Sequence, residues 1–124
     1  MTNKKNVVLI ALHPDAVNYR RWPGLDADRL RRQLEEQKHA LEEEGVDAAL
    51  CLVDSGRTAS EAVTEALDRR PYDCVVIDAG LRADDERFPL FEKVLNLVHE
   101  HAPTANICFN TGPEDTVNAA RRWL

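Results

Sequence analysis

The sequence predicts a single α/β domain over residues 1–124, built around a doubly wound, mostly parallel sheet of four strands. Four short, apolar and β-branched runs alternate with four segments of helical periodicity. The apolar runs are nearly continuous, which is typical of strands covered on both faces of a parallel sheet. A chain of 124 residues has the size of one ordinary domain, and neither a linker nor an internal repeat divides it.

The predicted strands are the apolar runs themselves, Val7–Leu12, Ala48–Val53, Cys74–Ile77 and Ala105–Phe109. Each of the three cysteines, Cys51, Cys74 and Cys108, lies singly inside such a run or at its start. Because they are odd in number and lack metal-ligand spacing, we expect buried free thiols rather than a metal or redox site.

The predicted helices begin at recognisable sequence signals. In the first, Leu30, Leu34 and Leu41 share one face and Gly45 provides a stop. The helices are expected over about 26–44, from the capping box Thr58–Glu61, from near Pro89, and from around Gly112–Pro113 to the end of the chain. Right-handed crossovers then favour the strand order 2-1-3-4 with helices on both faces, a flavodoxin-like arrangement without the fifth strand.

The amino-acid composition limits the classes of binding partner that we expect. The formal net charge is −6, which disfavours nucleic acid and anionic membranes because both are bound through clustered Lys and Arg. The first apolar run, Val7 to Leu12, is too short for an export signal or a membrane span. We therefore expect a cytoplasmic protein that binds neither nucleic acid nor a membrane.

The connection lengths point to one edge of the sheet. Ligands of doubly wound sheets bind beyond the carboxyl ends of the strands where the winding reverses, here between strands 1 and 3. The loops that follow these two strands, 13–25 and 78–88, are long, whereas 54–57 and 110–112 are short. The sequence therefore predicts a site between the two long loops.

The candidate ligand-binding residues lie on these loops and on the neighbouring strand ends. They are His13, Asp15, Arg20, Arg21, Trp22, Asp78, Arg82, Asn110 and Thr111. Because arginine binds phosphate and carboxylate in a forked geometry, a small anionic ligand is expected. In the alternative interpretation Tyr19 and Trp22 cover the sheet edge or an interface with a protein partner or a second copy of the chain.

Catalytic and metal roles are less well supported. His13 could act as a general base or simply form a local hydrogen bond. Asp15, Asp54 and Asp78 follow adjacent strands and could hold Mg²⁺, but aspartates also form turns and helix caps there. Nucleotide-binding glycine motifs and a nucleophile elbow are absent from the sequence. We therefore assign no catalytic residue, no metal and no cofactor.

The segment 73–82 resembles the strand and loop of response-regulator receiver domains that carry the phosphorylated aspartate. Asn110-Thr111 falls where receivers place a hydroxyl residue, so the resemblance implies Asp78 as phosphoacceptor and Thr111 as the switch hydroxyl. His13-Pro14-Asp15 stands in place of the receivers' acidic pair, and their lysine after a fifth strand has no counterpart. These departures favour a receiver-like fold without phosphotransfer.

A second resemblance covers more of the chain. Segments 22–25, 71–77, 91–103 and 106–113 are similar to a family of small bacterial proteins that has no assigned activity. This resemblance implies a one-domain, bacterial and cytoplasmic protein, and it implies no mechanism.

Two hypotheses of function follow. The leading one is a non-enzymatic, receiver-like regulatory or interaction module, which would expose Trp22, Phe88 and Trp123 in one apolar patch. The alternative is a small-molecule-binding protein or minor enzyme with an anionic ligand at the switch point. It would gather His13, Asp15, Asp78 and Arg82 around one pocket with Trp22 as a lid.

Overall fold

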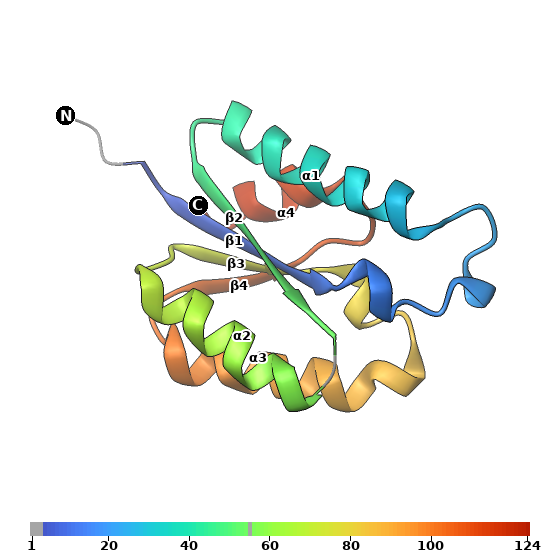
Figure 1. Ribbon diagram of the computed structural model, residues 1–124. Coiled ribbons are helices and arrows are strands. Elements are labelled where there is room, and N and C mark those ends of the chain that lie inside the picture. The colour runs from blue at the N-terminus through green and yellow to red at the C-terminus, as the bar shows by residue number, and fades with distance from the viewer. Residues whose placement is uncertain (1–3, 55) are drawn as a thin grey trace.

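The computed structural model describes residues 4–54 and 56–124, in which four strands alternate with four α-helices. Figure 1 shows the arrangement. The strands are β1 (Asn6–Leu12), β2 (Asp47–Val53), β3 (Cys74–Ile77) and β4 (Asn106–Phe109); the helices are α1 (Ala27–Glu43), α2 (Gly56–Arg69), α3 (Phe88–His101) and α4 (Thr116–Arg121).

The sheet has the predicted order β2-β1-β3-β4, and every neighbouring pair is parallel. The carboxyl ends of all four strands therefore meet at one edge. Ile77 of β3 pairs with Phe109 of β4, so the next residues, Asp78 and Asn110, emerge side by side at that edge.

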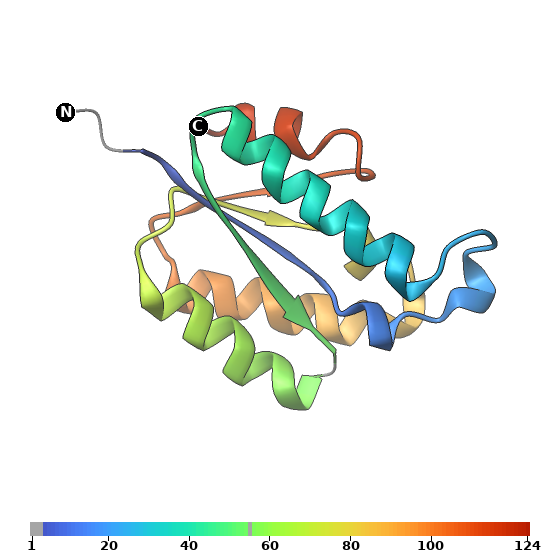
Figure 2. The ribbon, with the colours of Figure 1, turned by 45° about the horizontal axis from the view of Figure 1, so that its top comes forward.

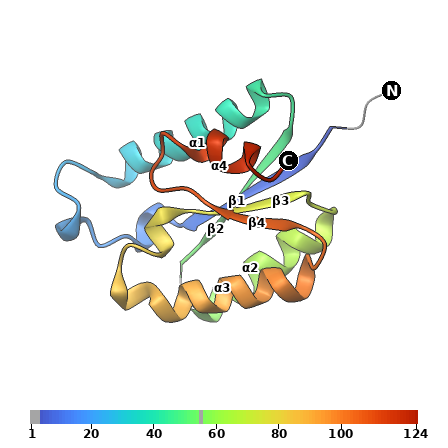
Figure 3. The same cartoon turned by 180° about the vertical axis from the view of Figure 1, so that it is seen from behind.

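Helices cover both faces of the sheet, which confirms the doubly wound prediction. Helices α1 and α4 lie on one face and α2 and α3 on the other (Figures 1 and 3). The side chains of β1 alternate between the two faces of the sheet. Val7 and Leu9 pack toward α1 and α4, whereas Val8 and Ile10 pack toward α2 and α3. All three cysteines are buried and free, as expected.

Two helix starts differ from the predictions. Helix α2 begins at Gly56, so Thr58 lies within its first turn and donates to Asp54 instead of capping the helix. Ser55 lies outside the described residues. Helix α4 begins only at Thr116, because the carboxylate of Asp115 accepts hydrogen bonds from the amides of Thr111 and Gly112 and holds that segment in a turn. The connection after β4 is therefore longer than predicted.

The long loops are structured by short 3-10 turns. The loop after β1 contains turns at Pro14–Ala16 and Tyr19–Arg21, and it projects beyond the sheet (Figure 2). The loop after β3 contains turns at Ala79–Leu81 and Asp85–Arg87. In the described part of the chain, no helix has the length and apolar character needed to cross a membrane.

Candidate functional site

A cavity of about 240 Å³ lies at the carboxyl edge of the sheet, and we refer to it as the switch-point cavity. Its walls come from the loops after β1, β3 and β4 and from the first half of α1. The lining residues are Leu12, Val17, Asn18, Trp22, Leu25, Leu30, Gln33, Leu34, Asp78, Ala79, Gly80, Ala83, Asp84, Thr111, Gly112 and Pro113. The lining is mostly apolar with a few polar groups, as is typical of small-molecule sites.

A buried polar network anchors the ends of β3 and β4 beside this cavity. Asn110 is fully buried, and its side-chain Nδ2 donates to Asp78 Oδ1 over 2.9 Å and to Thr116 Oγ1 over 2.8 Å. Thr116 in turn donates to Gln37 Oε1 of α1 over 2.5 Å. Asn110 Oδ1 accepts from the amide of Ala79 over 2.7 Å. This network joins β3, β4, α1 and α4, so it fixes the loops that form the cavity floor.

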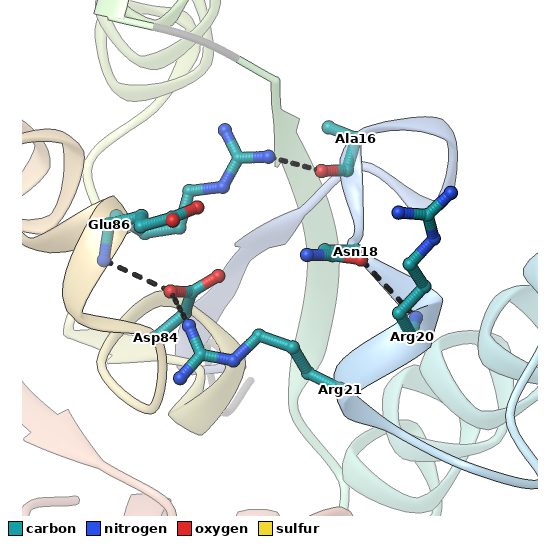
Figure 4. A network of polar contacts seen from close by, with 7 residues as sticks. Ala16, Asn18, Arg20, Arg21, Asp84 and Glu86 are labelled. Carbon is teal, nitrogen blue, oxygen red and sulfur yellow. Dashed lines mark hydrogen bonds and ion pairs between the residues drawn. The ribbon is translucent and has the colours of Figure 1, made fainter.

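Two arginine contacts tie the loop after β1 to the loop after β3, and we name them the arginine strap (Figure 4). Arg21 Nη1 lies 2.5 Å from Asp84 Oδ1, and Arg87 donates to the carbonyl of Ala16. The Tyr19 hydroxyl also donates to the carbonyl of Pro14 over 2.5 Å within the first loop. The strap holds the two walls of the cavity in a fixed relation.

Asp84 is the most deeply buried carboxylate in the lining, with 6% of the residue exposed. Its Oδ1 accepts both from Arg21 and from the amide of Glu86, the latter over 3.0 Å. Among residues 4–54 and 56–124, every hydrogen bond and ion pair of the Asp84 side chain is made by Oδ1, and Figure 4 draws the second oxygen without a partner. Asp84 therefore retains acceptor capacity beside the cavity.

Several backbone amides of the surrounding loops and of the start of α1 are paired with the protein's own side chains. Asp78 accepts from Gly80, Asp26 accepts from Arg29 at the start of α1, and Asp115 accepts from Thr111 and Gly112. Burial of Asp115 raises its pKa, but these bonds, led by the one from the Thr111 hydroxyl, hold the pKa below its ordinary value. These amides are therefore not free to bind an external anion.

The structure brings part of the predicted residue set to the cavity. Trp22, Asp78 and Thr111 line it, and Asn110 lies in the buried network beside it. His13 and Asp15 do not line it: His13 Nδ1 accepts from the Asp15 amide over 3.0 Å, which is the local bond expected of a turn residue. Within the described residues, no group of three His, Cys, Asp or Glu side chains could hold a metal ion.

The predicted arginines lie outside the lining. Arg21 binds Asp84, and Arg20 is exposed, with its backbone amide bound to Asn18. Arg82 donates to the carbonyl of Asn110 and lies 5.2 Å from the centre of the Phe109 ring. Its buried Nε is without a hydrogen-bond partner in the described part of the chain. The sequence predicted all three arginines near the switch point. In the structure the guanidiniums of Arg21 and Arg82 contact other parts of the protein.

Several site residues are absent from the predicted set, and only one of them carries a signal in the sequence. Asp84 falls within the predicted loop 78–88, but no motif distinguishes it from the other acidic residues there. Gln37 falls between Leu34 and Leu41 on the apolar stripe of α1, and a polar residue on that face signals a buried hydrogen bond. Gln33 and Thr116 had no comparable signal, because the tertiary contacts of α1 and α4 give them their roles.

The thiols of Cys74 and Cys108 meet on the α1 and α4 side of the sheet, with Sγ atoms 3.3 Å apart. The hydrogen bond to Cys108, followed by burial, raises the pKa of Cys74. Burial alone raises the pKa of Cys51 from 9.0 to about 11. High pKa values disfavour the reactive thiolate, which fits a packing role for these two residues.

Comparisons with known proteins give information on the fold and none on the function. No family model matches the chain, and no curated protein does. The crystal structure of a "putative lipoprotein from Peptoclostridium difficile 630 (fragment)" is similar over 95% of this chain and 93% of that chain. The TM-score is 0.53 and the identity 15%, so the similarity is one of fold alone.

Proposed function

We propose that this protein is a small-molecule-binding domain whose ligand occupies the switch-point cavity. The observation that carries this proposal is an apolar cavity of about 240 Å³ at the edge where doubly wound sheets bind ligands. A buried network and the arginine strap support its walls, so the site is pre-formed rather than assembled by the ligand.

The distribution of exposed aromatic residues favours this proposal over an interaction patch. Trp22 lines the cavity with 39% of the residue exposed. The carbonyl of Trp123 accepts from Asn106 at the start of β4, at the opposite edge of the sheet. Phe88, at the start of α3, packs edge-on against Phe91 with ring centres 6.2 Å apart. Trp22 and Trp123 therefore belong to opposite ends of the molecule rather than to one patch.

A receiver-like regulatory role without phosphotransfer remains compatible with ligand binding, because a ligand could supply the signal that phosphorylation supplies in receivers. We also retain a cytoplasmic location in a bacterium as part of the proposal. The similar solved structure carries the name of a lipoprotein, and that name describes the other protein.

Trp22 offers a direct test of the proposal. In a Trp123→Phe background it is the only tryptophan, and its fluorescence reports on the cavity. We would titrate benzyl alcohol, 2-phenylethanol and 3-phenylpropan-1-ol, which are uncharged and combine an apolar body with one polar group. Saturable changes in Trp22 emission are expected, because the lining presents the same mixture of surfaces.

Two variants locate the binding site. Ala83→Phe introduces a ring into the lining and should abolish the response, whereas Thr104→Phe adds the same ring at an exposed position outside it. Absence of saturable binding by all three alcohols, or equal binding to both variants, would contradict the proposal. In that outcome the interaction module becomes the better hypothesis.

A further inference from the structure

We propose that the switch-point cavity selects ligands with an apolar body and a protonated amine, and that it discriminates against anions. The inference rests on the proposed function, because it concerns the charge of the ligand in the same cavity. It differs from the anionic ligand that the arginine content of the loops predicts.

The charge of the lining is the first argument. Asp78 and Asp84 line the cavity, and no Lys, Arg or His belongs to the lining in the part of the chain that the structure describes. The strap supplies one compensating cation, because Arg21 lies 2.5 Å from Asp84 Oδ1. Asp78 therefore has no cation paired with it in the described lining, and in a partly enclosed site this charge acts through a lower dielectric than bulk water.

The second argument concerns the features that normally bind anions. Helix starts and loop amides attract phosphate and carboxylate when their N–H groups are free. Here Asp26 binds the first turn of α1, and Asp78 and Asp115 bind the amides of the loops after β3 and β4. An incoming anion would have to displace a carboxylate that already holds each position.

Three of the nearby cations are engaged elsewhere, and a fourth, Arg20, is exposed and lies outside the lining. Arg82 contacts the Asn110 carbonyl and the Phe109 ring, and Arg87 contacts the Ala16 carbonyl. Arg29 donates to the carbonyl of Gly24 over 3.1 Å. Binding an anion would require one of these guanidiniums to exchange an existing contact for the ligand.

The second oxygen of the Asp84 carboxylate indicates which ligand group suits the cavity. The Asp84 side chain is 8% exposed, yet among the described residues only its Oδ1 has partners. A carboxylate oxygen without a protein donor is available to a ligand, and an ammonium group provides donors together with the opposite charge. Trp22 in the same lining adds a ring that can pack on an apolar body or face a cation.

Three probes with one body and different charges test this inference: 3-phenylpropan-1-ol, 3-phenylpropylamine and 3-phenylpropionate. Measured by Trp22 fluorescence in the Trp123→Phe protein, the amine should bind about tenfold more tightly than the alcohol. The carboxylate should bind more weakly than the alcohol. The alcohol reports on the cavity alone, so its binding tests the proposed function separately.

Opposite changes in the charge of the strap provide matched variants. Asp84→Asn removes the negative charge, and the preference for the amine over the alcohol should be lost. Arg21→Gln removes the competing cation, and that preference should rise about threefold. Retained alcohol binding in each variant shows that the cavity has kept its shape.

The outcomes separate the two proposals. If none of the probes binds, the proposed function is wrong. If the alcohol binds but the carboxylate binds as tightly as the amine, the site is real and the inference about charge is overturned. The inference is overturned as well if Asp84→Asn leaves the preference for the amine unchanged.

Discussion

Asn110→Ala should be among the most destabilising single substitutions at this edge of the sheet. The Asn110 side chain makes hydrogen bonds of 2.7, 2.8 and 2.9 Å to Ala79, Thr116 and Asp78, and the residue is 0% exposed. At about 1 kcal/mol for each bond, with a further penalty for buried groups left unpaired, the loss comes to roughly 4 kcal/mol. Truncation of a surface asparagine costs far less.

Urea denaturation at 25 °C, followed by circular dichroism, measures this loss as a lower midpoint at constant slope. Asn106→Ala is the matched control, because Asn106 begins the strand that Asn110 follows, is exposed, and makes one side-chain bond of 3.0 Å to Trp123. It should cost below about 1 kcal/mol. Equal effects of the two substitutions would refute the view that the buried network organises the site.

Asn110→Asp keeps the shape of the side chain and removes its hydrogen-bond donor. The variant keeps the acceptor for the amide of Ala79, but it replaces the donor by a second carboxylate within hydrogen-bond distance of Asp78. It should be strongly destabilised at pH 7 and regain stability as the pH falls, because one of the two carboxyls then takes up a proton and donates it. A pH-independent loss would show that the donor role is unimportant.

Further predictions concern the thiols, the strand-end aspartate and the helix stop. Because burial raises the pKa of Cys51 from 9.0 to about 11, its contribution to stability is complete below pH 9 and is lost as the pH rises toward 11. The loss amounts to about 2–3 kcal/mol, and it should be absent from a pH series of denaturation curves on Cys51→Ala. Asp78 should not accept a phosphoryl group, since its oxygens accept from Asn110 and Gly80 and no cation lies in the described lining. A gain of one phosphate in the intact mass after incubation with acetyl phosphate and Mg²⁺ would contradict this. Gly45→Ala should cost about 1 kcal/mol, because Gly45 ends α1 at φ +86° in open space. No measurable change in the melting midpoint would refute the conformational argument.

The fold was predictable because its signals are local and repeated. Continuous apolar runs identified the strands, and chain connectivity with right-handed crossovers then determined their order. The errors lie at the starts of α2 and α4, where one or two side chains decide between helix and turn. Asp115 closes a turn on Thr111 and Gly112, and the sequence offers an equally good helix start three residues earlier.

The position of the cavity was also within reach of sequence reasoning, because the switch point follows from strand order alone. Its lining was only partly predictable. Leu30, Gln33 and Leu34 come from α1, and they face the cavity because of the angle at which that helix packs on the sheet. Such packing depends on side chains distant in the sequence, so no local pattern identifies it.

The charge preference of the site depends on pairing, which a sequence does not show. Arg21 and Arg82 count as free cations in a linear chain, and the folded chain pairs one with Asp84 and directs the other to Asn110 and Phe109. The aspartates among the loops bind backbone amides in the same way. Because carboxylates fill the anion-binding positions while Asp84 keeps one oxygen open, pairing converts an arginine-rich rim into a lining that favours a cation. The sign of a site's charge is therefore a tertiary property, even where every charged residue is visible in the sequence.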